Sequence, residues 1–295
     1  MRAAKGCLGI DFGGTKVALR VESEDAQPDE TVFRWPDGDI TRDLTALSDG
    51  VRALLDRWPG TVGAVGVAMP ATLDRARRVV SWPGRPSWAG TDIGTVLQAL
   101  FPTAEVRLAD DGDLAALAEA AAVGRGDIVY LGVGTGIGGG FVLGGRPALV
   151  SGEVGHMIID RSGPVCDCGR RGCLQSIASG PATLRRAAFA RGAPVTFEEL
   201  RAAWLAGEPW AVSAVDESCA ALAASVVGLC ELVHPAAIVV GGGFATGLPG
   251  FTAVVDAHTH ALQRPGHPAP EVHEAVLGGL SSLRGALLLA REAIA

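Results

Sequence analysis

Two distant segments of this chain share one pattern: an apolar strand, a turn built largely of glycine, and a second apolar strand. The first segment is GCLGIDFGGTKVALRVE at residues 6–22, and the second is DIVYLGVGTGIGGGFVLGG at residues 127–145. Glycine turns lack Cβ atoms, so their backbone N–H groups can converge on an anion. Duplicated halves with one such turn each predict two α/β lobes that close on one ligand.

The composition is that of a globular, ligand-binding chain. Of its 295 residues, 41 are glycine, about twice the usual share of roughly 7%. These glycines follow no G-X-Y repeat, which excludes collagen, and the 48% of apolar residues excludes a disordered chain. The net charge of −7 argues against nucleic acid or an anionic membrane as a partner.

The sequence also carries no export or membrane signal. No stretch approaches the 18 or more uninterrupted apolar residues of a membrane span, and the residues before Asp11 lack the apolar core of a signal peptide. Cys7, Cys219 and Cys230 are scattered among apolar residues. We therefore expect a cytoplasmic protein with reduced thiols.

Hydrophobic patterns predict further elements in both halves. The expected strands are 61–70, 105–109 and 236–244, and the expected helices are 41–57, an Ala-rich helix ending at Gly124, 209–233 and 281–295. No low-complexity linker separates the halves. The domains expected are a small lobe of residues 1–109 plus 282–295 and a large lobe of residues 110–281.

The first glycine turn brings several binding groups together. Gly13, Gly14, Thr15 and Lys16 offer backbone donors, a hydroxyl and a cation, and Asp11 adds a carboxylate that could hold Mg²⁺ through water. The alternative is an ordinary hairpin turn. A Walker P-loop or a Rossmann fingerprint is excluded, because a strand follows the turn where those motifs need a helix.

Two more glycine runs follow expected strands. They are Gly134, Thr135 and Gly136 in the second turn, and Gly241, Gly242 and Gly243 at the end of a third strand. Three glycine runs at strand ends favour binding of nucleotide phosphates over ordinary turns.

One histidine and three cysteines form the most specific pattern in the chain. His156 is followed by Cys166, Cys168 and Cys173, with glycines that permit a tight reversal between the last two. One imidazole and three thiolates make a tetrahedral Zn²⁺ set, and four protein ligands leave no open position for catalysis. The alternative is buried thiols beside a core histidine, and a redox pair would need C-x-x-C. The pattern predicts a structural zinc site.

Three aspartates, Asp110, Asp111 and Asp113, stand where a strand ends and a helix begins. Acidic residues are favourable at a helix N-cap and in its first turn. One aspartate can cap the helix and a second can interact with the helix dipole. The third aspartate is not explained by capping. It is a candidate for acid–base chemistry.

In chain order, five motifs resemble those of the ROK sugar kinases. They are DFGGTK (11–16), LGVGTGIGGG (131–140), GEVGH (152–156), CDCGRRGCLQ (166–175) and VVGGGF (239–244). The resemblance covers nearly the whole chain. It implies a two-lobed actin-like, hexokinase-type ATPase fold with ribonuclease H-like lobes and an active site in the interlobe cleft. It also implies ATP on the first two glycine loops, with residues 241–243 near adenosine, and a homodimer.

The same resemblance assigns roles to residues of the sugar side. It implies that Asp111 is the catalytic base and that Glu153, His156 and Gln175 line the sugar. Three departures from the family pattern stand out: Asp110 and Asp113 replace asparagines, Gln175 replaces a glutamate, and Gly84 replaces an asparagine of a PNLPGW-like loop.

The departures bear on which sugar is bound. In the family the position of Asp110 faces C3–C4 of the sugar, where a carboxylate suits an ammonium better than a hydroxyl. Gln175 removes negative charge near C1–C2, where glucosamine carries its amine. Together they predict phosphorylation at O6 of 3-amino-3-deoxyglucose (kanosamine). If Asp110 only caps the helix, glucose is the substrate.

The sequence does not decide between several other functions. Within the kinase class these are N-acetylmannosamine or fructose as substrate and polyphosphate as donor. A non-catalytic sugar sensor is disfavoured by the retained Asp111 and phosphate loops. A ROK repressor is disfavoured because only ten residues precede Asp11, too few for a helix-turn-helix.

Overall fold

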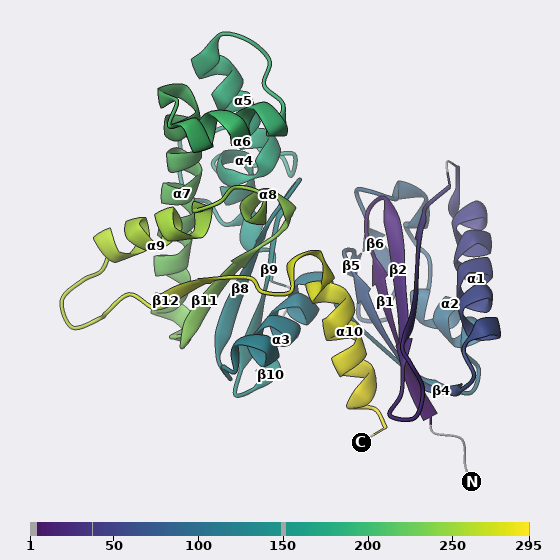
Figure 1. Cartoon of the computed structure of the whole chain (residues 1–295). Coiled ribbons are helices and arrows are strands. Elements are labelled where there is room, and N and C mark those ends of the chain that lie inside the picture. The colour runs from purple at the N-terminus through teal and green to yellow at the C-terminus, as the bar shows by residue number, and fades with distance from the viewer. Residues whose placement is uncertain (1–4, 37, 149–151, 295) are drawn as a thin grey trace. The chain divides into compact units, whose positions relative to one another are not determined.

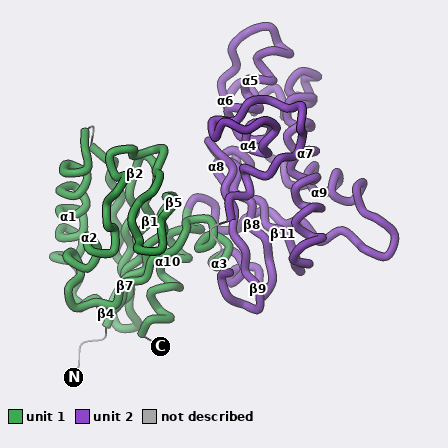
Figure 2. Tube along the Cα trace, turned by 180° about the vertical axis from the view of Figure 1, so that it is seen from behind, with its two compact units in different colours: residues 1–118, 280–295 green, residues 119–279 purple. Residues whose placement is uncertain are grey.

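The chain forms two compact units. The structure, a computed structural model, describes residues 5–36, 38–148 and 152–294 (Figure 1). Unit 1 comprises residues 1–118 and 280–295, and unit 2 comprises residues 119–279 (Figure 2). The first division lies inside helix α3 (Asp111–Val123), whereas the sequence analysis placed it at the end of the preceding strand.

Unit 1 is built on a five-stranded sheet. Its strand order is β3 (Asp29–Arg34), β2 (Lys16–Glu22), β1 (Lys5–Phe12), β4 (Thr61–Met69) and β7 (Glu105–Asp110). Helices α1 (Ile40–Arg57) and α10 (Ser281–Arg291) lie on opposite sides of this sheet (Figure 1). A Cβ added at Gly66 would lie 1.8 Å from the carbonyl oxygen of Ala286. Glycine in the sheet therefore lets α10 pack directly on the strands.

The remaining elements of unit 1 are short and lie between β4 and β7 in the sequence. They are β5 (Thr72–Leu73), β6 (Val79–Ser81), the 3-10 turn η1 (Pro86–Trp88) and α2 (Ile93–Leu100). Asp92 caps α2 by accepting a hydrogen bond from Thr95 N at 3.0 Å.

Unit 2 repeats the strand arrangement of unit 1. Its sheet has the order β10 (Arg146–Pro147), β9 (Ile137–Leu143), β8 (Ile128–Val133), β11 (Ala237–Gly241) and β12 (Glu271–Glu274). In each unit an antiparallel hairpin carries the glycine turn, and its first strand pairs in parallel with the next strand of the sheet. The duplication predicted from the glycine turns is confirmed.

The helices of unit 2 pack on this second sheet or on one another. They are α4 (Leu174–Ala178), α5 (Gly180–Arg191), α6 (Phe197–Ala206), α7 (Pro209–Val233), α8 (Gly243–Thr246) and α9 (Phe251–Ala261), with 3-10 turns η2 (Val154–His156) and η3 (Gly278–Leu280). By length and hydropathy α7 could cross a membrane, but 56% of its apolar window is buried inside the protein. We assign α7 to the core of unit 2, where Val215, Leu222 and Val226 are fully buried.

Candidate active site and zinc site

The first glycine turn joins β1 to β2. Gly13 N donates to Lys16 O at 2.9 Å, which closes the turn and leaves Gly14, Thr15 and Lys16 exposed. Among the described residues, a Cβ added at Gly14 would meet open space. Burial raises the pKa of Asp11 to about 6, against the opposing effect of Lys16. The turn therefore presents exposed donors and one cation beside a half-buried carboxyl group.

The second glycine turn closes in the same way between β8 and β9. Gly134 N donates to Gly136 O at 2.9 Å, and Thr135 is exposed. Gly180 N, at the start of α5, donates to Gly134 O at 2.9 Å. Gln175 Oε1 accepts from Ile137 N at 3.1 Å. The structure thus places Gln175 against the second glycine turn, a contact that its sequence position did not reveal.

Glycine is also required in the third run, at the end of β11. A Cβ added at Gly241 would lie 2.7 Å from Ala275 Cβ. Gly242 has φ +86°, and an added Cβ would lie 2.5 Å from backbone atoms of Val133. Only Gly243 is exposed with open space beside it. Close packing therefore explains the first two glycines, and the third alone leaves room for a ligand.

The aspartate cluster lies where β7 runs into α3. Asp110 Oδ1 accepts from Gly112 N at 2.9 Å and so caps the first turn of the helix. The backbone carbonyl of Asp111 accepts from Ser282 Oγ at 3.2 Å, and Asp113 is buried with 1% of its surface exposed. The predicted position of the three aspartates at a strand end and a helix start is confirmed, and Asp110 caps the helix.

The surroundings of Asp110 disfavour its charged form. Burial, followed by repulsion from Asp111 and then Asp113, raises the pKa of Asp110 to about 7, although the backbone N–H groups of residues 112 and 113 oppose the shift. A cation placed against Asp110 would lower that pKa and relieve the repulsion. A proton shared within the cluster would do the same.

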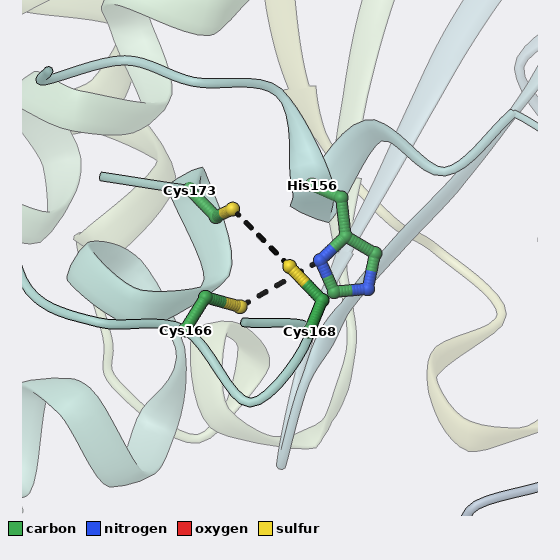
Figure 3. A group of neighbouring side chains, drawn as sticks. All are labelled: His156, Cys166, Cys168 and Cys173. Atoms are coloured by element: carbon green, nitrogen blue, oxygen red, sulfur yellow. Dashed lines mark hydrogen bonds between the residues drawn. The ribbon is translucent and has the colours of Figure 1, made fainter. Parts of the chain in front are cut away.

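The four candidate zinc ligands lie together in unit 2. Figure 3 shows His156, Cys166, Cys168 and Cys173 turned toward one another, and their ligand atoms lie within 4.8 Å of one another. The sulfurs of Cys168 and Cys173 are 3.6 Å apart, and Cys166 Sγ is 3.7 Å from His156 Nδ1. Tetrahedral Zn²⁺ with its usual bond lengths places two sulfurs about 3.8 Å apart and sulfur and nitrogen about 3.6 Å apart. The residues fit zinc, with Nδ1 as the ligand atom of the histidine.

Glycines make the tight loop around these ligands possible. Gly169 and Gly172 have φ +87° and +70°, values that other residues rarely adopt. A Cβ added at Gly172 would lie 1.4 Å from the carbonyl oxygen of Asp160. Glu153, three residues before His156, is exposed, and its carbonyl accepts from His156 N at 2.9 Å.

One contact at the first glycine turn was missed from the sequence. Trp35 Nε1 donates to Gly13 O at 2.8 Å, and Trp35 N donates to Thr15 O at 3.1 Å. The segment 81–88, whose tryptophans pack on Trp35, was the sequence feature that pointed to an aromatic cluster. The spacing of these residues did not show that Trp35 is their partner.

Comparison with known proteins decides the family. The model of the ROK family matches residues 7–293. The chain belongs to the ROK family. Among curated relatives, this ROK protein is 52% identical over 288 residues to the kanosamine kinase of Amycolatopsis mediterranei, covering 96% of this chain and 95% of that one. It is 30% identical to the glucokinase of Thermotoga maritima, covering 81% of this chain and 82% of that one.

Solved structures of the family confirm the predicted two-lobed actin-like fold. The ROK hexokinase of Thermus thermophilus matches with a TM-score of 0.86 and 32% identity, covering 98% of this chain and 99% of that one. A ROK glucokinase of Streptomyces griseus, solved with glucose and AMPPNP, matches with a TM-score of 0.81 and 25% identity, covering 97% and 99%. The sequence-based assignment to the sugar kinases of this family is confirmed.

Proposed function

We propose that this ROK protein transfers the γ-phosphate of ATP to the C6 hydroxyl of kanosamine. The observation that carries the proposal is the aspartate cluster at the start of α3, where burial and repulsion raise the pKa of Asp110, in a chain 52% identical to a kanosamine kinase. One carboxylate in the cluster serves the chemistry, and another serves recognition of the amine.

Asp111 is the catalytic base in this proposal. Phosphoryl transfer needs the acceptor oxygen in line with the phosphate and its proton accepted as the new bond forms. Asp111 begins α3, and Ser282 Oγ holds its backbone carbonyl. Its carboxylate would accept the proton of the 6-hydroxyl, while the fixed backbone keeps that carboxylate in place.

The glycine turns bind the donor. Gly13, Gly14, Thr15 and Lys16 supply N–H groups, a hydroxyl and an ammonium to the phosphates. In unit 2, Gly134, Thr135 and Gly136 supply further N–H groups, and the exposed Gly243 lies near adenosine, whereas Gly241 and Gly242 serve the packing of β11. Asp11 would hold Mg²⁺ through water, and the metal ion would screen the charge of the phosphates.

Sugar recognition combines hydroxyl and amine contacts. Glu153 is exposed, and it accepts hydrogen bonds from sugar hydroxyls. His156 Nε2 is free for the sugar when Nδ1 binds zinc. Asp110 attracts a 3-ammonium group, whereas Gln175 is neutral and its Oε1 accepts from Ile137 N. The zinc site would hold the loop that carries these side chains, with no open position for chemistry.

A sugar panel with ATP–Mg²⁺ tests this function. Purified protein is incubated with kanosamine, glucose, glucosamine, N-acetylmannosamine or fructose, and the position of phosphate is read by NMR. Formation of kanosamine 6-phosphate supports the proposal. Absence of turnover with every sugar and with either ATP or polyphosphate would instead indicate a sugar sensor. The proposed assembly and location, a cytoplasmic homodimer, are checked by light scattering and cell fractionation.

A further inference from the structure

A cluster of aromatic rings lies under the first glycine turn of unit 1. Trp82 and Trp88 have ring centroids 5.2 Å apart, and Trp35 lies 5.8 Å from Trp88 and 6.1 Å from Trp82. All three side chains are buried. Two of them belong to the segment 82–88, which we call the tryptophan loop.

A buried ion pair is built into this aromatic cluster. Asp43 on α1 is 0% exposed, and it accepts from Trp88 Nε1 at 2.8 Å and from Arg85 Nη1 at 3.1 Å. Arg85 Nη1 also donates to Pro36 O at 3.1 Å, and its guanidinium lies 5.4 Å from the ring centroid of Trp35. Arg85 is thus fixed by a carboxylate, a carbonyl and an aromatic face.

Stability alone does not explain this buried ion pair. A buried ion pair seldom stabilises a protein more than apolar side chains of the same size would. Arg85 Nε is buried and has no hydrogen-bond partner among the residues that the structure describes. An unsatisfied buried donor calls for an explanation beyond stability. Fixing the geometry of nearby segments is such an explanation.

The segments that meet here are two loops. Trp35 holds the first glycine turn through its bonds to Gly13 O and Thr15 O. From the other side, a Cβ added at Gly84 of the tryptophan loop would lie 3.3 Å from Gly14 Cα. The tryptophan loop and the first glycine turn are therefore neighbours. Trp35 contacts the glycine turn, and Arg85 of the tryptophan loop contacts Trp35.

We propose that Arg85 and Asp43 are positioning residues that fix the tryptophan loop and the first glycine turn together, so that one planar guanidinium sets the geometry of both. The inference rests on the proposed function only for what the loops bind. Asp43 orients Arg85, Arg85 packs on Trp35, and Trp35 holds Gly13 and Thr15. A shift of the guanidinium consequently moves the donors that face the phosphates and the loop beside them.

Two substitutions of Arg85 separate positioning from charge balance. Arg85→Met removes the charge and leaves Asp43 unpaired. Arg85→Lys keeps the charge but loses the planar fork and its stacking. If Arg85 only neutralises Asp43, lysine restores both stability and kinetics. If Arg85 positions the loops, lysine restores thermal stability while KM for ATP and for the sugar both stay raised, by about tenfold, since small misplacements of binding groups are costly.

The control is an ion pair of unit 1 outside this cluster. Arg57 donates through Nε to Asp29 Oδ2 at 2.6 Å on the exposed surface, and Arg57→Lys should leave both KM values unchanged. Trp35→Phe, which keeps a ring but removes the donor to Gly13 O, should raise KM for ATP more than KM for the sugar.

The decisive measurement is Kd for AMPPNP by calorimetry, beside both KM values. Weaker AMPPNP binding by Arg85→Lys, with a melting temperature near wild type, supports positioning. Wild-type Kd and KM values in Arg85→Lys would overturn it, even if Arg85→Met fails to fold. AMPPNP binding needs no turnover. A wild-type protein that phosphorylates no sugar would therefore refute the proposed function, while the Kd values for AMPPNP would still test the role of Arg85.

Discussion

The zinc cluster in unit 2 and the aspartate cluster in unit 1 are both dense groups of ionisable side chains, but they differ in how their charges are balanced. The four zinc ligands come from one short segment, and a Zn²⁺ ion would offset two of the three thiolate charges. In the aspartate cluster, burial and then repulsion from Asp111 and Asp113 raise the pKa of Asp110 to about 7. The first cluster is complete once its metal is bound, and we propose that the second binds a cationic substrate.

Breaking the zinc cluster should have the largest effect. We expect about one zinc per chain, and Cys168→Ser should lose the metal together with detectable sugar binding, because the ligands and the proposed sugar contacts share one loop. Metal analysis and calorimetry check this. Cys230→Ser, outside the cluster in unit 2, is the matched control. Full activity of metal-free protein would contradict the structural role of zinc.

Removing the base from the aspartate cluster comes next. Asp111→Asn should lower kcat by roughly 10²-fold or more, the usual scale for general-base catalysis, with ATP binding and folding nearly unchanged. Steady-state kinetics and AMPPNP titration measure both. Asp92→Asn, which keeps the cap of α2, should retain wild-type kcat. A variant of Asp111 with more than about a tenth of wild-type kcat would rule out its assignment as base.

The charge of Asp110 should give a smaller, pH-dependent effect. Its carboxylate attracts an ammonium only when deprotonated, so with a pKa of about 7 the preference for kanosamine over glucose should rise with pH. Between pH 6 and 7.5 the ratio of kcat/KM values should increase several-fold, while the amine of kanosamine stays protonated. Asp110→Asn should flatten that rise. A ratio that is independent of pH in wild type would contradict recognition by this carboxylate.

The smallest expected effect is on stability. A carboxyl group whose pKa is raised on folding stabilises the protein below its unfolded pKa and loses that contribution as pH rises through its folded pKa, here about 7. Asp110→Asn should therefore raise the melting temperature by a few degrees at pH 8 and by less at pH 5. Asparagine still caps the helix, so the change reports charge alone. A lower melting temperature at pH 8 would mean that the charge of Asp110 stabilises α3.

The two clusters were not equally predictable. Spacing alone gave the zinc set, because His156 through Cys173 lie in one segment and glycines force the reversal. The glycine hairpins, α1 and α7 followed from local pattern in the same way. The charge state of Asp110 could not be derived, since it depends on burial by segments far along the chain.

Contacts between distant residues explain what the sequence did not reveal. Trp35 bonds to Gly13 across 22 positions and Gln175 to Ile137 across 38, so neither contact has a local signature. The edge strand β12 has no fully buried side chain, so it lacks the apolar run that identified β11. For Asp110, the two interpretations, helix capping and membership of the aspartate cluster, are compatible. Its Oδ1 caps the helix, and its carboxyl group is part of the cluster.

The central claim is that the aspartate cluster selects an amino sugar. It is tested most directly by kcat/KM for kanosamine, glucose and glucosamine at pH 7.5, on wild type and on Asp110→Asn. A charge-assisted hydrogen bond contributes about 1.5–3 kcal/mol, which is about 10- to 150-fold in discrimination. We predict that wild type prefers kanosamine by a factor in this range and that Asp110→Asn loses most of the preference. A wild type that prefers glucose, or a variant that keeps the preference for kanosamine, would contradict the account.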